Sequence, residues 1–162
     1  MGTKLILIRH GVTDWNMEKR YCGYTDIDIN SQGIAQARCL RARLKDEIVH
    51  KVYSSDKIRA LNTGRIVFEG REMEKIPGVR EMGFGVLEGL SYPEIVQRYA
   101  EIYKRWLSDP FGTQIPEAES LEDFQKRVLT VFGGIIASNQ DKAVAIVSHG
   151  GVISVFINSI LK

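Results

Sequence analysis

The fold of this chain is decided by an apolar run that ends in a basic pair and a glycine, Leu5-Ile6-Leu7-Ile8-Arg9-His10-Gly11. A second apolar run near the other end closes in the same way, Ala143-Val144-Ala145-Ile146-Val147-Ser148-His149-Gly150-Gly151. Continuous apolar runs are typical of strands that are covered on both faces of a parallel sheet. Open α/β sheets bind their ligands at the edge where such strands end. We therefore expect His10 and His149 to lie together at that edge.

The composition indicates one globular domain over residues 1–162, because 44% of the residues are apolar and 26% are charged. The net charge of +2 is too balanced to indicate a nucleic-acid partner, and no apolar stretch is long enough to span a bilayer. The chain starts directly on a strand, and Cys22 and Cys39 have no metal-type spacing. We therefore expect a cytoplasmic protein with two reduced thiols, away from membranes. The sequence predicts no particular oligomeric state.

Strands and helices alternate along the chain, which predicts an α/β fold with three layers, a mainly parallel sheet flanked by helices. Further short strands are predicted at 51–54 and 76–79. Helices are predicted from their apolar spacing and their capping residues, at 34–44 after Ser31, at 56–68 before Gly70, and from Ser91, Ser120 and Gly150 onward. The turn-rich segment 109–119 is a candidate lid or substrate loop.

The first strand end carries the residue types that phosphoryl transfer needs. A neutral imidazole such as His10 is a competent nucleophile near pH 7, and the guanidinium of Arg9 matches phosphate oxygens. Gly11 permits a close approach by an anion, and Thr13 and Asn16 follow as short polar donors. An isolated histidine is more often structural than catalytic, but this context favours a nucleophile.

Further residues extend this site. His149 supplies a second imidazole, which in protonated form would help hold charge on the phosphoryl oxygens, and Arg59 lies near the start of the predicted helix 56–68. A general acid is needed for the leaving oxygen, and the glycine-rich segment 80–89 offers Glu81 and Glu88, between which position alone does not choose. His50 lies between charged residues and is assigned no role. No spacing suits a metal site, so we expect neither metal nor cofactor.

In these motifs the chain resembles the histidine phosphatase superfamily, also called the phosphoglycerate mutase-like family. The resemblance covers nearly the whole chain and rests on an ordered series of motifs: Arg9-His10-Gly11 with Thr13 and Asn16, Gly23-Tyr24-Thr25-Asp26, Ser31-Gln32-Gly33, Gln36-Ala37, Ser54-Ser55-Asp56 through Arg59-Ala60 and Thr63, Arg80-Glu81 through Glu88-Gly89, Glu119-Ser120, and Ser148-His149-Gly150-Gly151.

The resemblance implies a role for each matching residue. His10 would be the phosphorylated nucleophile and Glu81 the proton donor, whereas Glu88 would be structural. Arg9, Arg59 and His149 would form the phosphate pocket, and further phosphate-binding positions would be Asn16, Thr25 and Gly150. The implied activity is hydrolysis of a small phosphorylated metabolite through a phosphohistidine. The pattern is most similar to the α-ribazole phosphatase and broad phosphatase branch, which makes α-ribazole 5′-phosphate a candidate substrate.

Two alternatives remain at this point, a phosphoglycerate mutase and a phospho-ligand binding module without turnover. Mutases have a lysine where this chain has Ser91-Tyr92-Pro93, and an adjacent arginine pair to which Lys104-Arg105 is the nearest equivalent. These departures favour hydrolysis. Family members also continue past the last helix into another strand and a tail, whereas this chain ends at Lys162. The sequence is thus compatible with a natural short form or with a truncated one, and a truncated form would leave one sheet edge unpaired.

Overall fold

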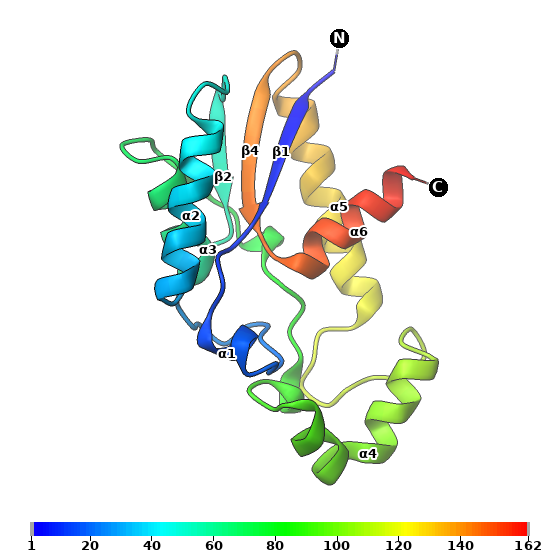
Figure 1. Ribbon diagram of the computed structural model, residues 1–162. Coiled ribbons are helices and arrows are strands. Elements are labelled where there is room, and N and C mark those ends of the chain that lie inside the picture. Colours follow the sequence, from blue (N-terminus) through cyan, green and yellow to red (C-terminus); the bar gives the residue numbers. More distant parts are fainter. Residues whose placement is uncertain (1, 162) are drawn as a thin grey trace.

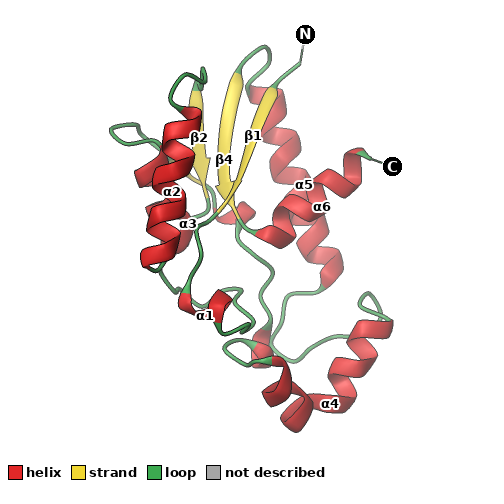
Figure 2. Ribbon diagram, in the orientation of Figure 1, coloured by secondary structure: helices red, strands yellow, loops and turns green. Residues whose placement is uncertain are grey.

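The computed structural model describes residues 2–161 and has a four-stranded sheet at its centre (Figures 1 and 2). The strands are β1 (Lys4–Arg9), β2 (Lys51–Ser54), β3 (Glu74–Lys75) and β4 (Ala143–Ser148). Their order is β1-β4-β2-β3 and every pairing is parallel. The last strand in sequence, β4, is present inside the sheet, and β1 forms one edge. The predicted parallel α/β fold is confirmed.

One predicted strand is misplaced. Pairing at β3 covers Glu74 and Lys75, and the chain then forms a 3-10 turn over Pro77–Val79 instead of the expected strand at 76–79. The N–H of Ile76 still donates to the carbonyl of Ser54 over 2.8 Å. Proline has no N–H for a sheet ladder and has a fixed φ, so the pairing stops there.

The helices match the predicted ones and include one short addition. They are α1 (Asp14–Met17), α2 (Ser31–Leu44), α3 (Ile58–Val67), α4 (Tyr92–Ser108), α5 (Leu121–Ser138) and α6 (Gly150–Ile160). Ser91 and Ser120 are the N-cap residues of α4 and α5, as predicted. The cap of α2 is Asn30 rather than Ser31, because the Asn30 side chain accepts a hydrogen bond from the N–H of Gly33 over 3.0 Å. The single turn α1 was not predicted.

The two faces of the sheet are covered by different helices (Figure 1). Alternate residues of a strand point to opposite faces. In β4, Val144 and Ile146 pack with residues of α5 and α6, whereas Ala145 and Val147 pack with residues of α2 and α3. This double burial explains why the strand is apolar throughout. The helices on both faces leave the carboxyl ends of the strands facing α1 and α4.

The helix α4 lies beyond these strand ends and has a small core of its own. Its centre is formed by four buried residues, Leu87, Ile95, Tyr103 and Ile115. Ile115 belongs to the predicted lid segment 109–119, which is therefore anchored in this core by an apolar side chain.

Three simpler observations complete the fold. Cys22 and Cys39 are free thiols, as predicted. His50 is exposed and its Nδ1 accepts a hydrogen bond from the N–H of Ala143 over 3.0 Å. Within residues 2–161, no helix has both the length and the apolar character needed to cross a membrane.

Candidate active site

The two strand-end histidines lie side by side because of the sheet register. Arg9, the last residue of β1, is paired with Ser148, the last residue of β4. The N–H of His10 continues the ladder to the carbonyl of Ser148 over 2.9 Å. The ring centroids of His10 and His149 are consequently 5.2 Å apart, with the rings tilted by 60°.

His10 is held in the form that a nucleophile requires. Its Nδ1 lies 2.8 Å from the carbonyl oxygen of Gly11. A carbonyl only accepts hydrogen bonds, so Nδ1 carries the proton and Nε2 keeps its lone pair. Burial, together with the positive charges of Arg59 and Arg9, lowers the pKa of His10 to about 4. The imidazole is therefore neutral at physiological pH.

Below His10 lies a fully buried group formed by Arg59, His149 and Ser55. Nε of Arg59 donates to Nδ1 of His149 over 3.3 Å, and its two terminal nitrogens donate to the carbonyls of Thr25 and Gly23 over 2.9 and 2.7 Å. Since Nδ1 of His149 accepts, Nε2 carries the proton and donates to Oγ of Ser55 over 2.9 Å.

The expectation of a protonated His149 is therefore wrong for this structure. Burial comes first among the causes that lower its pKa well below the ordinary value, and the charge of Arg59 comes next. A second proton on the ring would also have to occupy the nitrogen that accepts from Arg59. The positive charge at this depth is the guanidinium of Arg59.

The carboxyl group of Glu81 is held over the start of α6. Oε2 accepts from the N–H of Gly151 and Oε1 from the N–H of Met82, each over 3.0 Å. Burial raises the pKa of Glu81 above its ordinary value, and these two donors and the charges of Arg59 and Arg9 offset only part of that effect. The carboxyl group of Glu81 therefore holds a proton more readily than that of an ordinary glutamate.

Glu88 has a contrasting environment. Its carboxylate accepts from the N–H groups of Tyr24, Thr25 and Phe84 over 2.6, 2.7 and 3.1 Å, and from the hydroxyl of Thr25. Burial alone would raise the pKa of Glu88, but these hydrogen bonds outweigh it and lower the pKa below its ordinary value. As a carboxylate, Glu88 therefore joins the loop at Tyr24 and Thr25 to its own loop at Phe84, and both of its oxygens accept hydrogen bonds from backbone N–H groups.

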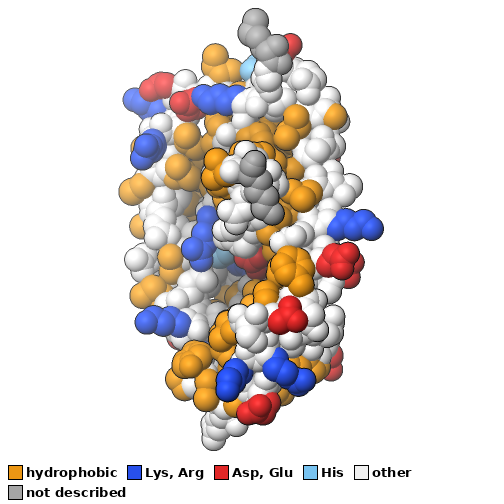
Figure 3. Space-filling model, turned by 90° about the vertical axis from the view of Figure 1, so that its right-hand side faces the viewer, with side chains coloured by type: hydrophobic (Ala, Val, Ile, Leu, Met, Phe, Trp, Pro, Cys, Tyr) orange, Lys and Arg blue, Asp and Glu red, His pale blue; other side chains and the backbone are white. Residues whose placement is uncertain are grey.

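A cavity of about 350 Å³ lies over His10. It is lined by residues from the end of β1, from α1 and the turn after it, and from the segment 80–89, namely Arg9, His10, Asn16, Lys19, Arg20, Tyr21, Cys22, Glu81 and Phe84. In the space-filling view, basic, histidine and acidic side chains gather in a hollow at the middle of the face that carries α6 (Figure 3). A larger cavity of about 500 Å³ lies beside His50 and Lys51, at the opposite end of β2, and is remote from these groups.

The remaining predicted residues fall into two groups. Asn16 lines the cavity, but its Oδ1 accepts from the N–H of Thr13, and the Thr13 hydroxyl accepts in return from the N–H of Asn16. These bonds cap α1, so Thr13 is a buried capping residue rather than a donor to a ligand. Thr25 is not among the lining residues, and its hydroxyl and N–H are both bonded to Glu88. The carbonyl of Thr25 accepts from Arg59, and the contact of Thr25 with a phosphate stays a prediction.

The predicted phosphate ligands lie at two depths. Arg9 lines the cavity and its guanidinium passes over Gly150, where an added Cβ would lie 3.6 Å from Nε of Arg9. Arg59 and His149 are fully buried beneath His10, and neither lines the cavity. Their direct contact with a phosphate stays a prediction. The segment 109–119 contributes no residue to the cavity lining, so its role as a substrate loop has no support here.

Sequence reasoning missed several participants. Ser55 was seen only as part of a family motif, although its hydroxyl is bonded to His149. Lys19, Tyr21 and Phe84 were not assigned to the site. Lys19 and Tyr21 reach the cavity from the turn after α1, and Phe84 reaches it from the segment 80–89. Among residues 2–161, no group of three or more histidine, cysteine, aspartate or glutamate side chains could hold a metal ion.

The arrangement combines a neutral imidazole with a free Nε2, a carboxyl group with a raised pKa, and two guanidinium groups at different depths. A nucleophile beside a proton donor and fixed positive charge is suited to displacement at phosphorus.

Comparison with known proteins gives a consistent picture. Residues 5–162 match the family model of the histidine phosphatase superfamily (branch 1). Phosphoglycerate mutase-like protein 4 of Arabidopsis thaliana is 34% identical over 93% of this chain and 67% of its own length. Phosphoserine phosphatase 1 of Hydrogenobacter thermophilus is 31% identical over 90% of this chain and 70% of its own length.

Solved structures show the same relationship. The α-ribazole phosphatase from Shigella flexneri superposes with a TM-score of 0.89 and 33% identity, over 96% of this chain and 78% of that one. The match of the family model over nearly all residues, together with relatives above 30% identity, establishes that the chain belongs to the histidine phosphatase superfamily.

Proposed function

We propose that this protein hydrolyses phosphomonoesters of small metabolites through a covalent phosphohistidine on His10. One observation carries the proposal: the hydrogen bond from Nδ1 of His10 to the Gly11 carbonyl leaves Nε2 as the free nitrogen, in a cavity shared with Glu81. The low pKa of His10 and the raised pKa of Glu81 support the same division between nucleophile and acid.

In the first step, Nε2 of His10 attacks phosphorus and the bond between phosphorus and the ester oxygen breaks. The proton of the Glu81 carboxyl moves to that oxygen, so the alcohol leaves as a neutral molecule. The positive charges of Arg9 and Arg59 stabilise the negative oxygens of the transferring phosphoryl group. The products of this step are the phosphohistidine and a Glu81 carboxylate.

In the second step, the Glu81 carboxylate takes a proton from water as the water oxygen attacks phosphorus. The bond between Nε2 and phosphorus breaks, which releases inorganic phosphate and restores neutral His10 and protonated Glu81. We propose that Arg9 and Asn16 hold the phosphate from the cavity side, and that Arg59, His149 and the backbone at Gly150 act from below.

The finer substrate assignment follows from resemblance. α-Ribazole 5′-phosphate is a candidate because a solved α-ribazole phosphatase shares the fold at 33% identity. Phosphoserine is another, because a relative is named for that activity. A panel of metabolite phosphates that includes both compounds would rank them by kcat/KM.

The mechanism is tested by trapping the intermediate. Brief incubation with p-nitrophenyl phosphate followed by an alkaline quench should leave a base-stable, acid-labile phosphate on the peptide that carries His10, detected by mass spectrometry. His10→Ala should show neither the label nor turnover. Full activity of His10→Ala, or a label on another residue, would contradict the proposal.

A further inference from the structure

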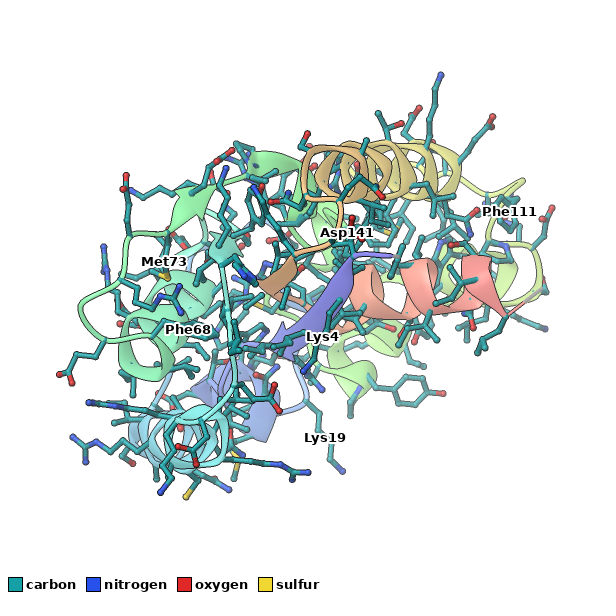
Figure 4. All side chains as sticks on the ribbon, turned by 90° about the horizontal axis from the view of Figure 1, so that it is seen from above. Lys4, Lys19, Phe68, Met73, Phe111 and Asp141 are labelled. Atoms are coloured by element: carbon teal, nitrogen blue, oxygen red, sulfur yellow. The ribbon has the colours of Figure 1, made fainter. Side chains whose placement is uncertain are left out.

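Lys19 is a positively charged residue of the cavity lining that has no role in the mechanism proposed above. It follows α1, lines the same cavity as His10, and its side chain projects from the ribbon at the edge of the molecule (Figure 4). Within the described chain, no carboxylate forms an ion pair with its Nζ. The charge of Lys19 is therefore available to a ligand.

The carboxylates near Lys19 are engaged by its neighbour. Arg20 binds Glu18 over 2.5 Å and Glu94 over 2.6 Å, and also donates to the carbonyl of Gly89 over 2.7 Å. Arg20 also lines the cavity, but its guanidinium is paired with two carboxylates. Among the described residues, Lys19 beside it forms no such ion pair.

The backbone of Lys19 favours a different residue. Its φ is +56°, in the left-handed region where glycine and asparagine are the residues most readily accommodated. The turn therefore does not account for a lysine at this position. The side chain is the feature that needs an explanation, and strained positions beside active sites are often functional.

Two aromatic residues of the cavity wall, Tyr21 and Phe84, form the surface against which a leaving group would lie. Tyr21 and Phe84 pack edge to face with centroids 4.9 Å apart, and the Tyr21 hydroxyl is bonded to that of Tyr103 over 2.7 Å. The two rings form a fixed apolar wall between the phosphate site and α4. Glu81 is the only acidic residue of the lining, so nothing in the wall compensates Lys19.

We propose that Lys19 is a binding site for a second anionic group on the substrate. The substrate class is a small phosphomonoester whose leaving alcohol carries a carboxylate or a second phosphate. The transferring phosphoryl group is served by Arg9 and Arg59, and the second anion by Lys19. This inference rests on the proposed function, because it takes His10 to mark the position of the phosphate. α-Ribazole 5′-phosphate has no anion in its leaving group and would gain nothing from Lys19.

The test compares matched substrates with and without the second charge. sn-Glycerol 3-phosphate and 3-phosphoglycerate differ chiefly in a hydroxymethyl group against a carboxylate. Fructose 6-phosphate and fructose 1,6-bisphosphate differ in a second phosphate. Each pair is assayed by release of inorganic phosphate with wild type, Lys19→Asn and Lys104→Asn. Asparagine suits the backbone of Lys19, and Lys104 is an exposed lysine of α4 outside the cavity lining, so both variants lose one positive charge.

We expect Lys19→Asn to lower the ratio of kcat/KM for the charged over the uncharged member by about fivefold in at least one pair, the effect of a partly exposed ion pair. Lys104→Asn should keep the wild-type ratio. The wild-type preference should also fall as salt is added, because exposed charges are screened. If the ratio falls for the first pair, the second anion is a carboxylate. If it falls for the second pair, the second anion is a phosphate.

Equal ratios in all three proteins for both pairs would overturn the inference. If no phosphate is released from any compound, the proposed function fails by itself. Calorimetric binding of the same four compounds to the same three proteins then decides the inference separately. A loss of affinity for a charged member in Lys19→Asn alone supports the second-anion site, and unchanged affinities refute it.

Discussion

Nε of Arg59 donates a hydrogen bond to Nδ1 of His149 across the floor of the site, over 3.3 Å. The bond joins α3 to the end of β4 and fixes His149 as a neutral ring. Arg59 is fully buried and its other donors bind backbone carbonyls, and among residues 2–161 no carboxylate forms an ion pair with it. The low pKa values of both histidines follow in part from this charge.

Removal of the Arg59 charge should therefore raise the pKa of both histidines. We expect Arg59→Met to move the ring titrations of His10 and His149 upward in two-dimensional NMR spectra. Arg9→Met is the matched variant, since the charge of Arg9 lowers the pKa of His10 but is not among the main influences on His149. A titration of His149 that is unchanged in Arg59→Met would show that the charge of Arg59 does not contribute to its lowered pKa.

Exchange of the two carboxyl groups for amides should separate chemistry from structure. Glu81→Gln loses the transferable proton, so kcat should fall by about 10²- to 10⁴-fold for an alkyl phosphate. The loss should be smaller for p-nitrophenyl phosphate, because its leaving group needs less protonation. Steady-state kinetics with the two substrates measures the difference.

The control for that experiment is Glu88→Gln. Its carboxylate accepts four hydrogen bonds from Tyr24, Thr25 and Phe84, so the amide should lower the free energy of unfolding by about 1–3 kcal/mol. The ratio of kcat for p-nitrophenyl phosphate over kcat for the alkyl phosphate should be the same in Glu88→Gln as in wild type. The assignment of the proton donor would have to be reversed if Glu88→Gln, and not Glu81→Gln, discriminated between the two substrates.

The two glycines at the start of α6 should respond differently to alanine. A Cβ on Gly151 would lie 2.3 Å from Oε1 of Glu81 and would displace the carboxyl group. A Cβ on Gly150 would meet Arg9 at 3.6 Å, which is ordinary contact. We expect Gly151→Ala to reduce kcat by at least tenfold, on the order of 1.4 kcal/mol, and to reduce it more than Gly150→Ala does. Equal activities would mean that the carboxyl position is not critical.

Acid should destabilise the protein partly through His10. Its pKa is lowered from 6.5 to about 4 in the folded state, so the unfolded chain binds more protons between these values. The contribution to stability is complete above pH 6.5 and is lost as the pH falls toward 4, by about 3 kcal/mol in total. Urea unfolding at several pH values should show a weaker acid dependence in His10→Gln. Because His149 and Glu81 are present in both proteins, the difference between the two curves isolates His10, and superimposable curves would refute the shift.

The fold could be predicted where local pattern and tertiary burial agree. The apolar runs of β1 and β4 indicated buried parallel strands, and the serine caps of α4 and α5 marked their starts. The pattern failed at β3, where two residues pair before Pro77. It also failed at α1, a single turn stabilised by the reciprocal bonds of Thr13 and Asn16.

In the candidate site, the positions of the histidines could be predicted but their protonation could not. Both lie at strand ends that the sequence reveals, and the register of β1 and β4 brings them together. The protonation of His149 depends on Arg59, which reaches it from α3. Arg20, which lines the same cavity, is paired with Glu94, a residue that lies far from it in the chain. Such pairings have no local signature.

The bond between the hydroxyls of Tyr21 and Tyr103 makes α4 a remote support for the cavity wall. Tyr103 packs in the small core of α4, which does not include His10. We expect a substitution in that core to move the Tyr21 ring, whereas His10, Glu81 and Arg59 are not part of the core. The residues proposed for the chemistry therefore lie outside the core that supports this part of the cavity wall, so the range of accepted substrates can change through α4 while those residues stay in place.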